Sequence, residues 1–326
     1  MRLPGEAPWG SRPAVIRQPI RIGTRASKLA LVQAGHMRDA IAAVLGDDEA
    51  AVLVHVTTSG DRIQDRRLMD IGGKGLFTKE IEEALLDGRI DCAIHSLKDM
   101  PAEGPAGLSI AAIPKREDPR DAFLSVRFDS FEALPQGARL GTASLRRQAQ
   151  ALHRRPDLEV FALRGNVDSR LARLEAGDAD AILLAASGLN RLGLGRLPRS
   201  LLDPAECPPA PGQGALAIQT RDADVEASWL TPLRDLEAGL TVAAERGALT
   251  ALEGSCRTAV GAHAVIAAGR LSLIVEALTP DGARRFRDFA TVGVESDHAE
   301  ADARAMGLRL GHAVREAGGA ALVAAS

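Results

Sequence analysis

Apolar positions along this chain follow two alternating patterns from residue 20 onward. Short, nearly continuous apolar runs at 20–22, 52–56 and 90–94 are typical of strands covered on both faces of a parallel sheet. Between the first two runs, apolar residues recur at helical spacing from Leu31 to Val44. Strands that alternate with helices in this way predict an α/β unit.

Polar residues at the ends of these segments predict where the helices begin and end. Ser27 is expected to cap the first helix and Gly46 to end it, and Thr78 and Gly88 are expected to do the same for a second helix. Gly23-Thr24-Arg25 is expected to form a tight turn after the first strand.

The middle of the chain repeats the pattern. Residues 140–147 (Leu-Gly-Thr-Ala-Ser-Leu-Arg-Arg) echo residues 22–27 (Ile-Gly-Thr-Arg-Ala-Ser), and apolar strands are expected at 160–163 and 181–185. Each turn would aim helix N–H groups and a guanidinium at an anion. We therefore predict a second α/β domain, joined to the first through prolines after Met100 and a hinge at 115–121.

The last third has a different pattern. A helix at 240–252 is followed by strand-like runs linked by Gly269 and Pro280-Asp281-Gly282, and then by a helix at about 298–317. This order predicts a small antiparallel α+β unit. The expected division is a disordered leader at 1–18, domain 1 at 19–115 and 215–234, domain 2 at 116–214, and domain 3 at 235–326. The strand-like runs are 260–268, 271–278 and 286–292.

Composition excludes several classes of function. The net charge is −3, aromatic residues make up 3% and Tyr is absent, which opposes nucleic-acid binding. No apolar run approaches the roughly 18 residues that a membrane span needs. Four prolines in the first twenty residues oppose a targeting helix. Three widely separated cysteines and seven histidines without ligand spacing predict neither disulfides nor a metal site, and fit a reducing cytoplasm.

The strand at 90–94 leads to Lys98 and Asp99, and Pro101 stops it. In an open α/β sheet, ligands bind beyond the carboxyl ends of the strands, so Lys98 and Asp99 are expected to lie at a ligand-binding position. The alternative is a turn with two solvated charges. Neighbouring cations would keep Asp99 ionised and burial would protonate it; either state suits proton transfer or stabilisation of a cation.

Six arginines stand at or just after predicted strand ends. Because guanidinium groups bind carboxylates and phosphates in bidentate fashion, six around one cleft would fit a ligand with several acidic groups. The alternative is that each pairs with a nearby acid on the surface. The six are Arg25, Arg146, Arg147, Arg164, Arg170 and Arg191.

Two other features remain open on the residues alone. The glycine-rich run 71–77 lacks the spacing of a P-loop, and is either a mobile loop over an active site or a plain loop. Cys256 follows the end of the helix at 240–252, where a buried structural thiol is the commoner role.

Taken together, seven motifs in this order resemble the porphobilinogen deaminase (hydroxymethylbilane synthase) family, from about residue 20 to the C-terminus. They are Gly23-Thr24-Arg25-Ala26-Ser27, residues 72–80, His95-Ser96-Leu97-Lys98-Asp99-Met100-Pro101, residues 141–147, Leu163-Arg164-Gly165-Asn166-Val167, Pro211-Gly212-Gln213-Gly214 and Leu252-Glu253-Gly254-Ser255-Cys256.

The resemblance implies two doubly wound, periplasmic-binding-protein-like domains plus a small third domain. It implies a transferase that joins four porphobilinogen molecules head to tail into 1-hydroxymethylbilane, on a dipyrromethane cofactor held by a thioether to Cys256. Asp99 matches the catalytic carboxylate. Further cofactor contacts are implied at Asp61, Lys98, Thr142, Ser144, Arg146 and Arg147, and substrate contacts at Arg25, Ser27, Lys74, Phe77, Arg164, Arg170 and Arg191. A cytoplasmic monomer is expected.

One position departs from the family. Some relatives carry a lysine where this chain has Asp70, so one loop contact to substrate carboxylates is in doubt. A solute receptor for a polycarboxylate would explain the twin domains and the arginines, but it predicts an export signal and gives Cys256 no role. A nucleic-acid binder would explain only the arginines.

Overall fold

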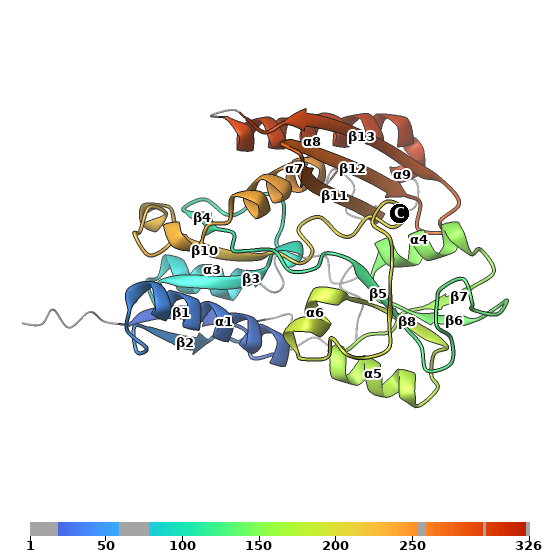
Figure 1. Ribbon diagram of the computed structural model, residues 1–326, viewed down its shortest axis with the longest axis horizontal. Helices are drawn as coiled ribbons and strands as arrows, with labels where there is room; N and C mark the ends of the chain where they lie inside the picture. Colours follow the sequence, from blue (N-terminus) through green and yellow to red (C-terminus); the bar gives the residue numbers. More distant parts are fainter. Residues whose placement is uncertain (1–18, 59–77, 253–258, 296–297, 324–326) are drawn as a thin grey trace, which may run out of the picture.

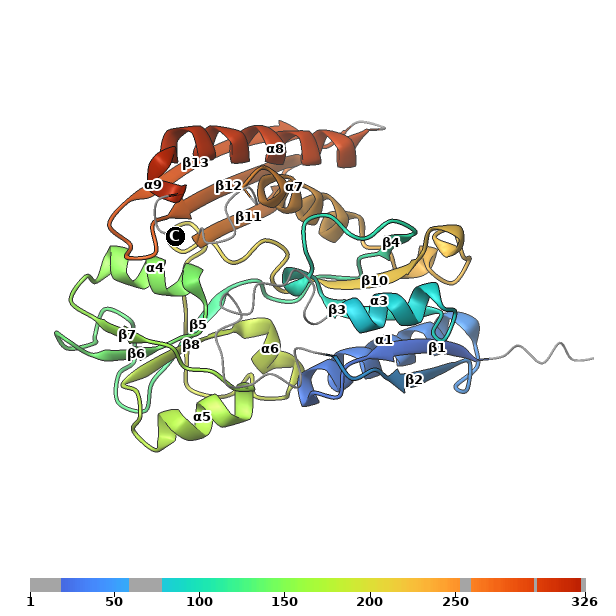
Figure 2. The ribbon, with the colours of Figure 1, turned by 180° about the vertical axis from the view of Figure 1, so that it is seen from behind.

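The computed structural model describes residues 19–58, 78–252, 259–295 and 298–323. The described strands form three sheets, two with five strands and one with three. The two larger sheets lie side by side and the smallest stands above both, next to helix α4 of the second sheet (Figures 1 and 2). The predicted fold class is therefore confirmed: two α/β units and a small antiparallel α+β unit.

The first sheet has the order β2-β1-β3-β10-β4. The strands β1 and β2 are parallel, as are β1 and β3, whereas β10 runs antiparallel to both of its neighbours. Helix α1 packs Ile41 against Ile22 and Ile218 of the sheet. The bounds are β1 (Ile20–Thr24), α1 (Lys28–Leu45), β2 (Ala51–His55), α3 (Lys79–Leu86), β3 (Cys92–Ser96), β4 (Leu108–Ala112) and β10 (Leu216–Arg221).

The second sheet repeats this plan with the order β7-β6-β8-β5-β9. The pairs β6–β7 and β6–β8 are parallel, and β5 is antiparallel to β8. Both larger sheets are thus mixed rather than wholly parallel. The bounds are β5 (Asp121–Leu124), β6 (Arg139–Gly141), α4 (Leu145–Arg154), β7 (Glu159–Phe161), α5 (Val167–Glu175), β8 (Ala181–Ala185), α6 (Ala186–Arg191) and β9 (Ser200–Leu201).

The third unit is an antiparallel sheet, β11-β12-β13, with helices α7 and α8 on one face. The two helices pack closely because small residues meet: a Cβ added at Gly307 would lie 1.9 Å from the carbonyl oxygen of Ala244. The bounds are α7 (Leu236–Leu252), β11 (Ala259–Ala267), β12 (Arg270–Leu278), β13 (Arg285–Gly293), α8 (Ala299–Gly318) and α9 (Ala320–Val323).

Most predicted boundaries agree with these elements within a few residues. Ser27 accepts a hydrogen bond from the Ala30 amide, and Gly46 ends α1 with φ +68°. Three expectations are wrong. Gly23 lies inside β1 rather than in a turn, Thr78 makes no side-chain cap bond, and the chain after Pro101 includes the strand β4.

The two larger sheets also touch through helix ends. Lys28, in the first turn of α1, lies 3.1 Å from the carboxylate of Asp168 in the first turn of α5. The N-termini of these helices therefore face each other from different sheets. Helix α1 begins at the motif Gly23–Ser27, and α5 follows Arg164, one of the six arginines expected to bind an acidic ligand.

Candidate functional site

The Lys98–Asp99 pair lies where β3 ends. A short 3-10 turn, η2 (Leu97–Asp99), follows the strand, and the Met100 amide donates to the Leu97 carbonyl at 3.1 Å. Leu97 and Met100 are buried, which turns Lys98 and Asp99 outward. Lys98 is half-buried and Asp99 is exposed. The turn thus places a solvent-accessible carboxylate beside a partly covered ammonium.

Lys98 lies among two cations, Arg146 and Arg147, and two carboxylates, Asp99 and Asp121. Its Nζ donates to Oε1 of Gln213 at 3.2 Å, and it makes no ion pair with a described carboxylate. Burial and, after it, the charge of Arg147 lower the pKa of Lys98 to about 8, although Asp99 and Asp121 oppose the shift. At neutral pH Lys98 is therefore a cation without a carboxylate partner among the described residues.

Arg146 and Arg147, at the start of α4, are buried and share one carboxylate. Arg146 donates to Asp121 at 2.6 Å and Arg147 at 2.8 Å, and none of the three side chains is more than 7% exposed. Burial by itself would raise the pKa of Asp121, but the two guanidinium groups hold it well below its usual value. These two arginines differ from the expectation of guanidinium groups free to meet a ligand, because an internal acid already pairs with them.

Arg164 and Arg170 are the opposite case. Nη1 of Arg164 and Nε of Arg170 are buried and have no hydrogen-bond partner among the residues that the structure describes. Burial, together with the charges of Arg147 and Arg164, lowers the pKa of Arg170 to about 10. Two half-buried guanidinium groups that repel each other and pair with no acid in the described part of the chain form a site prepared for an anion.

The remaining predicted contacts are hydroxyl residues at the starts of helices and two further arginines. Ser27 and Ser144 are helix caps, and Thr142 accepts from the Ser144 amide at 3.1 Å. Arg25 lies close enough to His95 to lower the pKa of that ring, and Arg191 donates to the Gly214 carbonyl at 2.7 Å. The structure therefore brings Lys98 and Asp99 together with the arginines of the second sheet, whereas Arg191 is held by backbone.

Several predicted residues lie outside the described part of the chain. They are Cys256, Asp61, Lys74 and Phe77, together with the departure at Asp70 and the leader at 1–18. Their roles stay predictions.

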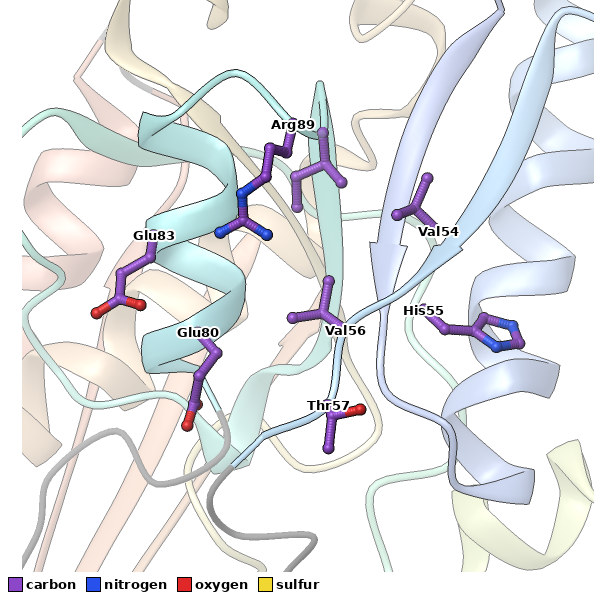
Figure 3. A pocket seen from close by; sticks show the side chains of 8 residues that line it. Val54, His55, Val56, Thr57, Glu80, Glu83 and Arg89 are labelled. Carbon is purple, nitrogen blue, oxygen red and sulfur yellow. The ribbon is translucent and has the colours of Figure 1, made fainter.

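A separate cavity of about 380 Å³ lies between β2 and α3 (Figure 3). Glu80, Glu83 and Arg89 line it from the side of α3 and Val56 from the side of β2, while the ring of His55 points away from the glutamates. No residue that the sequence predicted for ligand binding lines it. We therefore place the candidate site at the Lys98–Asp99 turn rather than in this cavity.

Sequence reasoning missed Asp121 and Gln213. Asp121 lies in the predicted hinge at 115–121, yet it is the first residue of β5, and Gln213 enters the prediction only as part of the family motif at 211–214. One sequence signal was available for Gln213, namely the glycines on both sides of it: in the structure Gly212 and Gly214 have positive φ angles (+74° and +90°), which glycine adopts most readily. For Asp121, only the fold reveals the pairing.

The described residues contain no group of three His, Cys, Asp or Glu side chains arranged to hold a metal ion. Among the helices that can be described, none has both the length and the apolar character needed to cross a bilayer.

Comparisons with known proteins agree over nearly the whole chain. Two family descriptions match: "Porphobilinogen deaminase, dipyromethane cofactor binding domain" at residues 20–228, and "Porphobilinogen deaminase, C-terminal domain" at residues 239–316. Proteins named porphobilinogen deaminase are 66% identical in Caulobacter vibrioides (94% of this chain, 98% of the relative) and 62% identical in Phenylobacterium zucineum (94% and 99%). A methionine-binding lipoprotein structure from Bacillus subtilis, described as putative in its title, is 12% identical with a TM-score of 0.40, covering 68% of this chain and 92% of that one.

Proposed function

Because the chain belongs to the porphobilinogen deaminase family, we propose that the Lys98–Asp99 turn and the arginines around it are the site of its reaction. The enzyme removes ammonia from porphobilinogen and joins four of these molecules head to tail into 1-hydroxymethylbilane, in tetrapyrrole biosynthesis. It works on a dipyrromethane cofactor. What the structure adds is a set of residues for each task.

The observation that carries this placement is the pair of buried guanidinium nitrogens, Nη1 of Arg164 and Nε of Arg170, that have no hydrogen-bond partner among the described residues. A dipyrromethane and the pyrroles added to it carry acetate and propionate side chains, which are the acceptors that buried N–H groups without partners require. The residues present therefore fit the cofactor. Arg164, Arg170 and Lys98 would hold its carboxylates, and Arg147 stands next to them.

When bound, the dipyrromethane supplies the pyrrole carbon at which the new bond forms. We propose that Cys256 holds it by a thioether, as the motif 252–256 implies. The attachment lies outside the described residues, so this assignment depends on the resemblance alone.

Asp99 is the proposed catalytic residue. Its carboxyl group is exposed at the turn, and its charge acts on both Lys98 and Arg147. A carboxyl group there can give a proton to the departing amine, stabilise the cation that porphobilinogen becomes when ammonia leaves, and later remove a proton from the new pyrrole. Lys98 and the arginines bind and orient the acidic side chains during these steps.

We also propose that the enzyme is a cytoplasmic monomer with three domains at 19–115 with 215–234, 116–214 and 235–326. The near-neutral net charge of −3 and the scarcity of aromatic residues support a small-molecule substrate rather than a nucleic acid. Three separate sheets, each with its own helices, support the division.

Intact-mass spectrometry of the purified protein tests the cofactor. We expect the mass of the chain plus two pyrrole units, and we expect Cys256→Ser to lack that addition. A wild-type mass equal to that of the bare chain would refute the assignment.

The catalytic role is tested with Asp99→Asn, which should retain the added mass and the far-UV circular dichroism spectrum but lose at least about 100-fold in turnover. Asp129→Asn, at an exposed aspartate of the second unit, is the control and should turn over normally. Turnover by Asp99→Asn within a few-fold of wild type would remove Asp99 from the mechanism.

A further inference from the structure

The carboxylate of Asp121 is a buried negative charge next to the cations of the candidate site. Asp121 begins β5 and is wholly buried, yet it accepts hydrogen bonds from three side chains. Arg146 donates to it at 2.6 Å, Arg147 through Nε at 3.0 Å and Nη2 at 2.8 Å, and Gln213 through Nε2 at 2.8 Å. A carboxylate with this many charge-assisted bonds has one fixed orientation, and it fixes its donors as well.

Gln213 extends this arrangement to the catalytic turn. Its Nε2 donates to Asp121 and to the Pro119 carbonyl, while its Oε1 accepts from Lys98 at 3.2 Å and from Arg147 at 3.4 Å. The side chain is fully buried, and every one of its polar atoms is used. A single amide thus connects the ammonium beside Asp99, on the first sheet, to a carboxylate on the second.

We propose that Asp121 is a positioning residue for the reaction: it fixes Arg146 and Arg147 and, through Gln213, the ammonium of Lys98 beside Asp99. This inference rests on the proposed function, in which Lys98 and Asp99 belong to the active site. Asp121 itself touches no substrate.

The arrangement divides the cations into two classes. Arg146 and Arg147 share the single negative charge of Asp121, whereas Arg164 and Arg170 have no acid among the described residues. An incoming carboxylate therefore meets two uncompensated guanidinium groups first, next to a pair whose orientation is already set. Such a site needs little reorganisation when an anion arrives.

Four charged side chains act on Lys98 from the elements packed around it. Asp99 lies on its own turn, Asp121 on β5 and Arg146 and Arg147 on α4. Asp99 and Asp121 favour the ammonium form, and the two arginines disfavour it. Removing the charge of Asp121 would therefore make Lys98 lose its proton at a lower pH.

The pH dependence of kcat/KM in the holoenzyme tests the proposal. The alkaline limb of this profile is the range in which kcat/KM falls as Lys98 loses its proton. In Asp121→Asn, this limb should move toward lower pH by about one unit. Asp121→Glu keeps the charge but displaces it, so the limb should stay at its wild-type pH while kcat falls about 10-fold or more. A purely structural role for Asp121 would lower the amount of folded protein and leave the limb in place.

Asp91→Asn is the matched control, because Asp91 pairs with Arg21 at 2.7 Å at the opposite end of the first sheet. It should leave the limb and the rate unchanged. Gln213→Leu is the second variant if Asp121→Asn does not fold; it removes the acceptor of Lys98 and should shift the limb in the same direction.

The test uses whichever of these two variants folds, carries the cofactor mass and turns over. If its alkaline limb is not shifted from that of the wild type, the proposal is overturned. Wild-type protein without that mass would instead refute the proposed function, so the two failures are distinguishable.

Discussion

Glu245 is the residue whose removal should cost the fold most. It lies on α7, is wholly buried and accepts four hydrogen bonds: two from Arg116, at 2.8 and 2.9 Å, and one each from the amides of Gly212 and Ala264, at 2.7 and 2.9 Å. Arg116 comes from the chain that passes from the first sheet to the second, and Gly212 from the chain that returns. The carboxylate of Glu245 therefore binds both connections between the two larger sheets to the third unit.

The size of the effect follows from two independent estimates. Removing one partner of a buried ion pair costs about 3–5 kcal/mol, because the other charge remains buried without compensation. Burial by itself would raise the pKa of Glu245, but the charge of Arg116 brings it down from 4.5 to about 2. A shift of that size corresponds to about 3 kcal/mol at neutral pH. Both estimates predict a large loss for Glu245→Gln.

Urea unfolding followed by circular dichroism at pH 7 measures this loss. Asp168→Asn is the control, because the Lys28–Asp168 pair also joins two units but is exposed, and exposed pairs contribute at most about 1 kcal/mol. A loss for Glu245→Gln no larger than that of the control would refute the reasoning.

The pH dependence of the stability tests the direction of the pKa shift of Glu245. Because the pKa of Glu245 is lower in the folded protein, its stabilisation is fully present above the unfolded value of 4.5 and is lost as the pH falls toward 2. The difference between wild type and Glu245→Gln should therefore shrink across that interval. A difference that grows toward acid would contradict the assigned shift.

Three further predictions concern the site and the core. Arg170→Met should raise KM about 10-fold or more, whereas Arg173→Met, at an exposed arginine on the same helix, should leave it unchanged; equal effects would argue against a ligand role for Arg170. Gly307→Ala should lower the free energy of unfolding by about 2 kcal/mol or more because its Cβ would collide with α7, while Gly239→Ala, with nothing within 4 Å, should raise it by up to about 1 kcal/mol. The buried ring of His95 should stay neutral down to about pH 4 in an NMR titration, and stability should fall as the pH drops from 6.5 toward 4 because the unfolded chain takes up the proton first; titration near 6.5 would contradict this.

The sequence predicted the third unit most closely, since each of its strands is a nine-residue run with turn residues at the ends. It missed β5, which is four residues long and begins with Asp121. Nothing local distinguishes that segment from a connection. Its place between β8 and β9 is set by pairing with strands that come much later in the chain.

The same limit applies to the site. The arginines were predicted from their places after strand ends, and on that basis Arg147 and Arg170 are equivalent. They differ because Asp121 pairs with Arg147, whereas no acid in the described segments pairs with Arg170. Charge compensation of this kind depends on contacts between segments far apart in the sequence, which residue spacing does not encode.

The position of β10 has a consequence during synthesis on the ribosome. It lies between β3 and β4, but it is translated only after the entire second sheet. Until then the nascent chain exposes an unpaired edge of β3, and β4 has no described neighbour at all. Open strand edges favour association between chains, so the newly made amino-terminal half is the part of this enzyme that most needs a chaperone.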